Sequence, residues 1–407
     1  MTAEVAILNT HGVALAADSA VTVSAGGEKK VYNTANKLFT LSKYHPVGIM
    51  IYNNATYMGI DWEIIIKEFR KTLRNEPCNT LFDYADSFIK YVKEFEFITE
   101  KQQKDTLFTE CHNIISHICY TYIKTLENKF VSVENITPEQ AAQVLNTVIE
   151  EDNNSVNNNL DVIFVEQYKN DILEIIGNWF EKYEISMNQK ENIFKIILSH
   201  LGEANHLGNV SGIVIAGYGD KEIFPSICQY EILGKIGRSF LFTMKKQVSI
   251  SYENQATILP FAQKEMVQMF MGGIDPGFQE TIEKQLENFM MTIISIIDDT
   301  YKNDLIKVKN KFIEQLTDFQ QRTFINPIMG IVKSLQKLDL AEMAETLVNL
   351  TAFKRHISKD AETVGGPTDV AVITKGDGFV WIKRKHYFDI KLNQFFQQKY
   401  FLEDENE

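Results

Sequence analysis

Hydrophobic and polar positions fall into successive blocks along the chain, and the first block has the pattern of β-strands. Up to about residue 60, short apolar runs occupy residues 4–8, 13–17, 31–41 and 47–52. The turn-rich segment Asn9-Thr10-His11-Gly12 separates the first two runs and predicts a hairpin. With Thr10 and His11 at the tip, the predicted pairs are Leu8 with Val13, Ala6 with Leu15 and Thr2 with Ser19.

Helical periodicity replaces the strand pattern after residue 60. Apolar residues then recur at spacings of three and four, which predicts two amphipathic helices. The two stripes are Trp62, Ile65, Ile66, Phe69 and Leu73, then Leu81, Tyr84, Phe88, Tyr91 and Phe95. Residues 100–205 are also mostly helical in pattern. The Asn-rich stretch from Glu151 to Asp161 interrupts them and predicts an exposed loop.

Strand and helix patterns then follow each other once more. Strands are predicted at residues 211–216, 227–232 and 238–244, and a second helical block at 262–358. Within it, two stripes predict a long antiparallel hairpin that turns at Asp298-Asp299-Thr300. Asp339 with Glu342 has the spacing of a capping box that opens the last helix. The final strands, 370–374 and 379–383, flank a Lys-Gly-Asp-Gly hairpin signal.

The order of these blocks predicts the fold class and its division. Strands and helices segregate rather than alternate, which favours an α+β protein with antiparallel sheets. We find neither a Pro/Gly-rich linker nor an internal repeat, so the helical blocks are interpreted as insertions into one β core. The predicted parts are core residues 2–95, a helical insertion at 96–209, central core strands at 210–262, a helical hairpin insertion at 263–335, the last core helix and strands at 336–390, and a tail at 391–407.

Composition excludes several classes of protein. Lys and Arg number 41 and Asp and Glu number 54, so the net charge of −13 disfavours nucleic acid as a partner. No apolar run approaches the ~18 residues of a membrane span, so no membrane association is expected. The first strand resembles a secretory signal only weakly, because its start carries Glu4 and no Lys or Arg. A cytoplasmic protein is therefore expected, with its four cysteines as buried free thiols.

Most familiar catalytic motifs are missing from the sequence, and the informative residue is Thr2. There is no GxSxG or HExxH, and Gly217-Tyr218-Gly219 lacks the third glycine of a phosphate loop. Removal of Met1 would expose the α-amino group of Thr2, whose ordinary pKa of about 7.7–8.0 leaves part of it neutral near pH 7. That amine can act as general base for its own hydroxyl. The alternative reading is ordinary, because very many proteins begin Met-Thr.

Two charged residues are expected beside Thr2. Asp18, followed by Ser19, ends a run of small apolar residues next to the position opposite Thr2. Lys37 interrupts the apolar run 36–41, where a lysine must either reach solvent or pair with a carboxylate. Paired with Asp18, Lys37 would lower the pKa of the Thr2 amine and stabilise the hydroxyl as it loses its proton. A strand-end turn residue and an edge-facing lysine remain the alternatives for the two.

These residues together resemble the proteasome β-subunit family of N-terminal nucleophile hydrolases. In that family an N-terminal threonine opens a hairpin, and an aspartate follows sixteen residues later, as Asp18 follows Thr2 here. Asn36-Lys37-Leu38 is similar to the strand that carries the family's lysine, although Lys37 lies three residues later than usual. Residues 213–220 are similar to the family's central strand.

Later segments extend the resemblance and also depart from it. Val364-Gly365-Gly366-Pro367-Thr368-Asp369 is closest to the bacterial proteasome homologues of the Anbu type. The resemblance implies that Asp360 and Thr363 take the places of the family's distal Asp and Ser. It also implies that Asn53 replaces the glycine whose N–H forms the oxyanion hole. The family's G-S-G serine has no counterpart, because that segment is Ile258-Leu259-Pro260-Phe261.

The resemblance implies a four-layer αββα sandwich with two helical insertions, and a threonine peptidase or amidase. Thr2 would form an acyl-enzyme, with Asp18 and Lys37 tuning its charge, and neither a metal nor an organic cofactor is needed. The implied partners are a protein or peptide substrate, other copies of the chain in a homo-oligomer, and a separate ATPase unfoldase. Two alternatives stay open: a catalytically inactive assembly or binding subunit, and a hydrolase of this superfamily that acts on a small amide.

Overall fold

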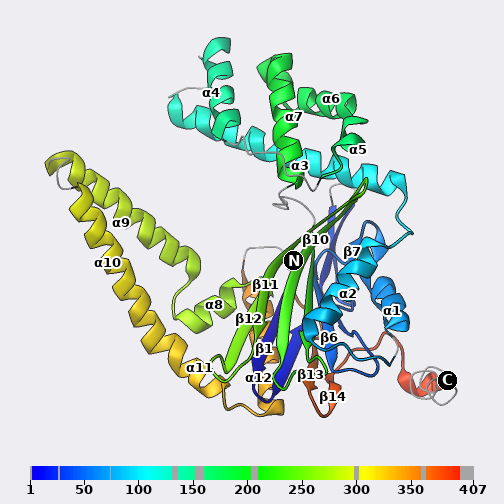
Figure 1. Ribbon diagram of the computed structural model, residues 1–407. Coiled ribbons are helices and arrows are strands. Elements are labelled where there is room, and N and C mark those ends of the chain that lie inside the picture. Colours follow the sequence, from blue (N-terminus) through cyan, green and yellow to red (C-terminus); the bar gives the residue numbers. More distant parts are fainter. Residues whose placement is uncertain are drawn as a thin grey trace.

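The computed structural model describes residues 2–25, 28–73, 75–130, 136–151, 160–202, 210–297, 302–358 and 364–394. Two five-stranded antiparallel sheets lie at its centre (Figure 1). The first sheet has the strand order β12-β1-β2-β13-β14. Its strands are β1 (Ala3–Asn9), β2 (Gly12–Ala17), β12 (Ala256–Ala262), β13 (Asp369–Thr374) and β14 (Gly378–Lys383).

The second sheet has the order β11-β10-β9-β6-β5, and two short ribbons accompany it. Its strands are β5 (Leu38–Thr40), β6 (Val47–Asn53), β9 (Ser211–Gly217), β10 (Ser226–Ile236) and β11 (Ser239–Ser249). The ribbons pair β3 (Val21–Ala25) with β4 (Glu28–Tyr32), and β7 (Thr56–Tyr57) with β8 (Ile60–Asp61). The predicted α+β class with antiparallel sheets is confirmed.

Burial on both faces explains why the strand patterns of β1 and β2 are nearly continuous apolar runs. Ala6 and Leu8 of β1 pack in a cluster with residues of the second sheet, such as Val214 of β9. Val5 and Ile7 face the other way and pack against helix α12 (Lys337–Ile357). On the far side of the second sheet lie α1 (Trp62–Thr72) and α2 (Leu81–Lys93), which share a third cluster with β6, β9 and β10.

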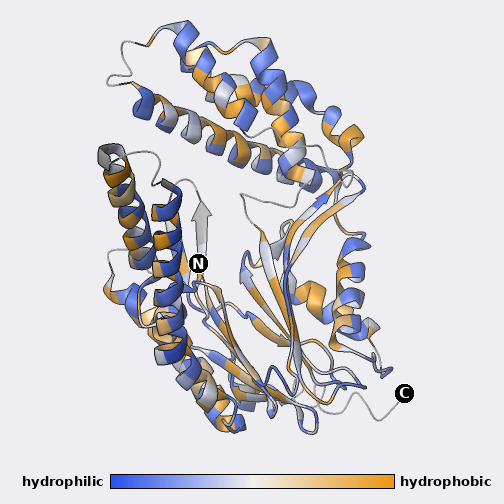
Figure 2. Ribbon diagram, turned by 60° about the vertical axis from the view of Figure 1, so that its left-hand side comes forward, coloured by the Kyte–Doolittle hydropathy of each residue, from blue (hydrophilic) through white to orange (hydrophobic). Residues whose placement is uncertain are grey.

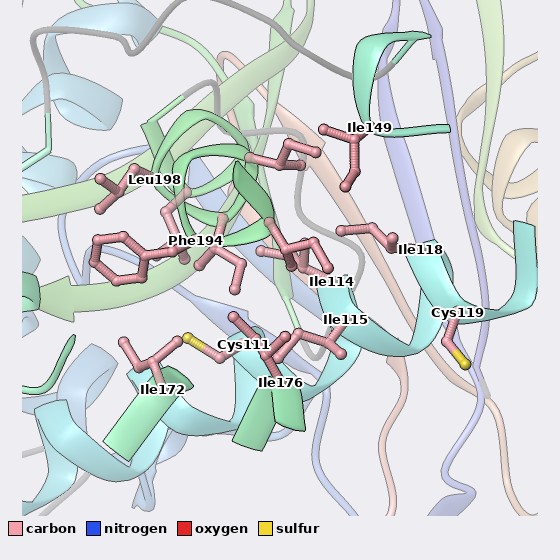
Figure 3. Packing of buried hydrophobic residues seen from close by; sticks show 14 of the residues in the cluster. Cys111, Ile114, Ile115, Ile118, Cys119, Ile149, Ile172, Ile176, Phe194 and Leu198 are labelled. Carbon is pink, nitrogen blue, oxygen red and sulfur yellow. The ribbon is translucent and has the colours of Figure 1, made fainter. Parts of the chain in front are cut away.

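The helical residues between α2 and β9 build a core of their own. This unit comprises α3 (Glu100–Lys129), α4 (Pro138–Glu151), α5 (Val162–Glu166), α6 (Lys169–Trp179), a short 3-10 turn (Glu181–Tyr183) and α7 (Met187–Gly202). Figure 3 shows how Cys111 and Ile115 of α3 converge with Ile176 of α6 and Phe194 of α7. Leu233, Ile236 and Leu241 join the same cluster, so this unit packs on the end of the β10–β11 ribbon.

A second helical segment lies between β12 and α12. It comprises α8 (Glu265–Gly272), α9 (Pro276–Ile297), α10 (Lys302–Gln320), a π-helical turn (Gln321–Ile325) and α11 (Asn326–Val332). Helices α9 and α10 run side by side and project away from the sheets (Figures 1 and 2). Large apolar side chains on this α9–α10 arm are exposed, among them Phe278, Phe289, Val308 and Phe319.

The hairpin register predicted from the sequence is confirmed. Leu8 pairs with Val13 and Ala6 with Leu15, and residues 10 and 11 form the turn. The predicted helices at 62–73 and 81–95 are confirmed as α1 and α2. The expected turn at 298–300 and most of the Asn-rich loop lie outside the described residues.

Two local predictions are wrong, and one strand was not predicted. The capping box of the last helix joins Gln336 and Asp339, because α12 begins at Lys337, and not Asp339 with Glu342. Lys37 precedes its strand, because pairing begins only at Leu38. Strand β12 includes residues 258–261, for which no separate strand was predicted; Pro260 is tolerated there because β12 is an edge strand.

The cysteines and the helices bear on two further expectations. Cys111, Cys119 and Cys228 are buried free thiols, whereas Cys78 is partly exposed. Over the described ranges, none of the helices combines the length and the apolar character required to cross a lipid bilayer.

Candidate active site

The β1–β2 hairpin brings Thr2 and Asp18 together. Thr2 directly precedes β1, and Asp18 directly follows β2. Two hydrogen bonds join the strand ends: Asp18 N donates to the carbonyl oxygen of Ala3 at 3.1 Å, and Ala3 N donates to Asp18 Oδ1 at 3.0 Å. Both side chains are buried, with 3% of Thr2 and 1% of Asp18 exposed. The turn chemistry at residues 9–12 therefore sets the relative position of a hydroxyl and a carboxylate.

Lys37, which directly precedes β5 of the second sheet, reaches both of these groups. Its Nζ lies 3.0 Å from Thr2 Oγ1, 2.7 Å from Asp18 Oδ1 and 2.6 Å from the carbonyl oxygen of Ala20. The Lys37 backbone is held in turn, because its carbonyl accepts a hydrogen bond from Ile51 N at 2.9 Å. An ammonium has three N–H donors, and all three have an acceptor here.

The Asp18 carboxylate is also fully hydrogen-bonded. Oδ1 accepts from Ala3 N and Lys37 Nζ, and Oδ2 accepts from Ala20 N at 3.2 Å and Gly365 N at 3.1 Å. A buried ion pair is stable only when such additional hydrogen bonds compensate for lost hydration. Four bonds to one carboxylate fix the direction in which Lys37 points.

The segment that contains Gly365 and Gly366 closes one side of this site. Ser19 N donates to the carbonyl oxygen of Gly365 at 3.1 Å, and Ser19 Oγ donates to the carbonyl oxygen of Pro367. Gly366 has φ +77°, and a Cβ added there would lie 2.8 Å from the Cβ of Asn33. A larger residue at 366 would therefore be strained and crowded, which gives a physical reason for the second glycine of the sequence motif.

Asn53 lies at the end of β6 in a conformation that favours glycine. Its φ is +64°, in the left-handed region, where asparagine is among the few non-glycine residues that are enriched. It is exposed and follows Ile51, the hydrogen-bond partner of Lys37, by two residues. Asn53 thus adopts a backbone conformation compatible with the glycine it replaces in the resemblance.

The remaining two candidate residues lie outside the described part of the chain. Asp360 and Thr363 fall between Ser358 and Val364, where residues 359–363 are not described. Their place in the site stays a prediction. Ser19, by contrast, is buried beside Asp18, where its hydroxyl anchors the 364–367 segment and does not contact Thr2 in the hydrogen bonds of the structure.

A pocket adjoins the site on the side of this glycine segment. It has a volume of about 590 Å³ and is lined by Val31, Asn33, Ala352, Phe353, His356, Val364, Gly365 and Gly366. Because Gly365 also binds Asp18, the wall of the pocket and the ion pair share one backbone segment. Among the described residues, no His, Cys, Asp and Glu side chains gather in a group able to hold a metal ion.

The sequence did not identify one functional candidate, Glu4. This residue of β1 is 1% exposed, and neither of its carboxyl oxygens has a hydrogen-bond partner in the structure. Burial raises the pKa of Glu4 well above its ordinary value; the positive charge of Lys37 opposes this rise, and Asp18 adds to it. The available signal was a lone glutamate within a strand that is otherwise apolar.

The site combines a hydroxyl, an ammonium and a carboxylate within hydrogen-bonding distance of one another. Lys37 is placed to stabilise negative charge that develops on Thr2 Oγ1, and Asp18 holds Lys37 in position. No side chain that hydrogen-bonds to Thr2 Oγ1 in the structure is a base, so the proton of the hydroxyl needs another acceptor. A free α-amino group on Thr2 would supply one.

Comparison with known proteins gives no match by sequence. No protein-family model matches the chain, and no curated protein matches it.

Similar solved structures are Anbu proteins. The Anbu complex from Pseudomonas aeruginosa, described as a helical assembly, is 9% identical; the match covers 98% of this chain and 92% of that one, with a TM-score of 0.32. Anbu, the ancestral beta-subunit, from Yersinia bercovieri is 8% identical over 98% and 94% of the two chains, with a TM-score of 0.27. Anbu from Hyphomicrobium sp. strain MC1 is 8% identical over 97% and 96%, with a TM-score of 0.31. The structures similar to this chain thus come from the Anbu-type proteasome homologues that its sequence resembles.

Proposed function

We propose that this chain is a proteasome-like threonine hydrolase that cleaves amide bonds in peptides or proteins, with Thr2 as its nucleophile. One observation carries the proposal. Thr2 Oγ1 lies 3.0 Å from Lys37 Nζ, which lies 2.7 Å from Asp18 Oδ1, and all three residues are buried. Buried ammonium groups beside a hydroxyl are uncommon in a core and suit the activation of a nucleophile.

The mechanism requires Thr2 to be the first residue of the active chain. Its neutral α-amino group takes the proton of Oγ1 as the oxygen attacks the substrate carbonyl carbon. Lys37 stabilises the developing alkoxide, and a backbone N–H near Asn53 is proposed to bind the oxyanion. The C–N bond then breaks, the leaving amine takes the proton from the Thr2 ammonium, and an ester on Thr2 remains. Water, deprotonated by the same amine, hydrolyses that ester.

The proposed framework is the four-layer αββα sandwich of N-terminal nucleophile hydrolases. Three core clusters support it: one between the two sheets, one under α1 and α2, and one under α12. We propose that the core consists of residues 2–95, 210–262 and 336–390, with insertions at 96–209 and 263–335 and a tail at 391–407. The separate hydrophobic core of α3 to α7 supports the first insertion.

Further partners and site residues belong to the same proposal. Exposed apolar side chains on the α9–α10 arm support a homo-oligomer with contacts made by helices. A separate ATPase would unfold protein substrates. Asp360 and Thr363 are proposed to complete the site next to Gly365, and Ser19 to hold that segment in place.

The experiment that tests the nucleophile combines intact-mass measurement with an epoxyketone, an electrophile that needs a hydroxyl and a free amine on the same residue. We expect the mass of a chain without Met1 and one adduct on Thr2. Thr2→Ala should remove the adduct and lower the rate on the order of 10⁴-fold or more, and Thr2→Ser should retain part of the activity. Thr10→Ala, in the turn of the same hairpin, is the matched control and should keep the adduct. Robust hydrolysis by Thr2→Ala, or by a chain that retains Met1, would contradict the proposal.

One observation favours the second candidate, a catalytically inactive assembly or binding subunit. Thr2 is only 3% exposed in the chain that begins at Met1, so Oγ1 is not open to a substrate in that form. This candidate predicts that Met1 is retained or that Thr2 is blocked, and that no adduct forms, so the same mass measurement separates the two. If an adduct forms, hydrolysis of small amides without hydrolysis of unfolded protein would assign the chain to the small-amide alternative.

A further inference from the structure

Glu4 occupies the interior of the sandwich directly behind Thr2. Side chains alternate along β1, so Glu4 shares its face with Ala6 and Leu8, which belong to the cluster between the two sheets. Its strand neighbours are Ala17 of β2 and Phe261 of β12, both buried and apolar. A carboxyl group that is 1% exposed in such surroundings is costly to ionise unless it is paired.

The nearby charged groups have no hydrogen bond to offer Glu4. Lys37 uses its three N–H donors on Thr2, Asp18 and Ala20. The Asp18 carboxylate has only acceptor oxygens, and four donors occupy them. The ion pair is therefore complete without Glu4, whose two oxygens have no partner in the structure.

The other side of Glu4 faces a polar group that adds no positive charge. Tyr52 of β6 stacks on Phe261, with ring centroids 5.9 Å apart. The negative charge of an ionised Glu4 would raise the pKa of the Tyr52 hydroxyl. That hydroxyl accepts a hydrogen bond from Gln229 at 2.5 Å and donates to Glu231 at 3.3 Å. Glu231 is itself paired with Lys245 at 3.1 Å. From both sheets, then, the groups around Glu4 are either neutral or already paired.

We propose that Glu4, behind Thr2, is a protonated, neutral carboxylic acid in the active form of the site. When Glu4 ionises, the site becomes inactive. With Glu4 neutral, the charges of Lys37 and Asp18 balance. An ionised Glu4 leaves one net negative charge beside Thr2. The switching part of this inference rests on the proposed function, whereas the neutral state of the buried carboxyl does not.

The effect on catalysis follows from the sign of that charge. A net negative charge raises the pKa of the Thr2 amine and so favours its protonated form, which cannot serve as a base. It also opposes alkoxide formation on Oγ1. The rate should therefore fall at alkaline pH as Glu4 loses its proton. Glu4 acts through Thr2 and Lys37 and is a positioning residue.

The first test measures stability and does not depend on activity. The folded-state pKa of Glu4 is raised, so above the ordinary value of about 4.3 the folded chain holds a proton that the unfolded chain releases. Stability linked to Glu4 is thus present below that value and is lost as pH rises toward the folded pKa. We expect the unfolding equilibrium constant of the wild type, divided by that of Glu4→Gln, to rise by up to about tenfold per pH unit. Urea unfolding of both proteins at a series of pH values measures this ratio.

Two further variants keep the stability test decisive. Glu280→Gln is the control, because Glu280 is exposed and Lys284 lowers its pKa, so its ratio should not rise with pH. If the buried amide of Glu4→Gln prevents folding, Glu4→Met replaces it as the reference, because methionine has neither the proton nor the polar atoms of Glu4. The ratio of wild type to Glu4→Met should then show the same rise with pH. A ratio that stays flat from acid to alkaline pH for Glu4 would overturn the proposal.

Spectroscopy and kinetics complete the test. The infrared difference spectrum of wild type minus Glu4→Gln should contain the C=O stretch of a protonated carboxylic acid at neutral pH, and its absence would overturn the neutral state. In the active enzyme, Glu4→Gln should lose the alkaline fall of the rate, and an unchanged fall would overturn the switch. Failure of the Thr2 adduct test would remove the proposed function and leave the stability and infrared results standing.

Discussion

Lys37→Met is the substitution that most directly tests the buried ion pair. It removes the ammonium and keeps the length and apolar volume of the side chain. Asp18 then keeps its three backbone donors, Ala3 N, Ala20 N and Gly365 N, but has no cation beside it. Removing one partner of a buried pair costs about 3–5 kcal/mol in the free energy of unfolding. Because three of the four hydrogen bonds to Asp18 remain, we expect a loss of about 3 kcal/mol.

The reverse substitution, Asp18→Ala, should cost more. It leaves the Lys37 ammonium buried without a carboxylate and strands three backbone N–H groups, each costing about 1–3 kcal/mol. A loss of at least about 5 kcal/mol is expected. In the Asp18→Ala background, adding Lys37→Met should cost nothing or restore stability, because no unpaired charge remains. The resulting coupling energy between the two positions should be about 3 kcal/mol.

Urea unfolding of the four proteins, followed by tryptophan fluorescence, measures this cycle. Trp62 is fully buried in the cluster beneath α1 and reports on the core. Lys71→Met, which removes an exposed pair with Glu68, is the control and should cost less than about 1 kcal/mol. A loss below about 1 kcal/mol for Lys37→Met, or effects that add within about 0.5 kcal/mol, would refute the reasoning.

Three other predictions concern stability and assembly. Burial lowers the pKa of His45, so the folded chain binds fewer protons than the unfolded chain below about pH 6.5; stability should fall as the pH drops through that window, and His45→Gln should flatten the fall seen in urea unfolding. Gly212→Ala should lower the free energy of unfolding by about 3 kcal/mol in the same assay, because the added Cβ would lie 2.0 Å from the ring of Tyr52. A urea midpoint equal to that of the wild type would contradict this contact. Light scattering should show an oligomer at micromolar concentration, and Phe289→Ser on the α9–α10 arm should shift it toward monomer; a monomeric wild type would count against the assembly.

Local order along the chain accounts for what the sequence predicted well. The β1–β2 register depends on a four-residue turn and on adjacent apolar runs, so Leu8 and Val13 could be paired by counting from the tip. Thr2 and Asp18 follow from the same register. Lys37 was identified because a charge in an apolar run needs a partner, although the strand begins only at Leu38, one residue after Lys37.

The features that the sequence did not predict depend on distant segments. The partner of β1 on its other edge is β12, more than 240 residues away, and no local pattern in β1 indicates which segment pairs with it. The unpaired state of Glu4 likewise cannot be inferred from β1 alone, because it depends on how Lys37 and Asp18 use all of their hydrogen bonds. Counting donors requires knowing which backbone groups meet, and Gly365 is supplied by the far end of the chain.

The position of β1 between β2 and β12 governs when the site forms during protein synthesis. The carbonyl of Thr2 accepts a hydrogen bond from Gln263 N, and the Asp18 carboxylate accepts one from Gly365 N. At about 5–20 residues per second, residue 365 follows residue 2 from the ribosome by about 20–70 s. The outer edge of β1 stays open until β12 is made, and Asp18 lacks its donor from Gly365 until later still. In a nascent chain, the first strand is therefore made well before the hydrogen bonds around Thr2 and Asp18 can be completed.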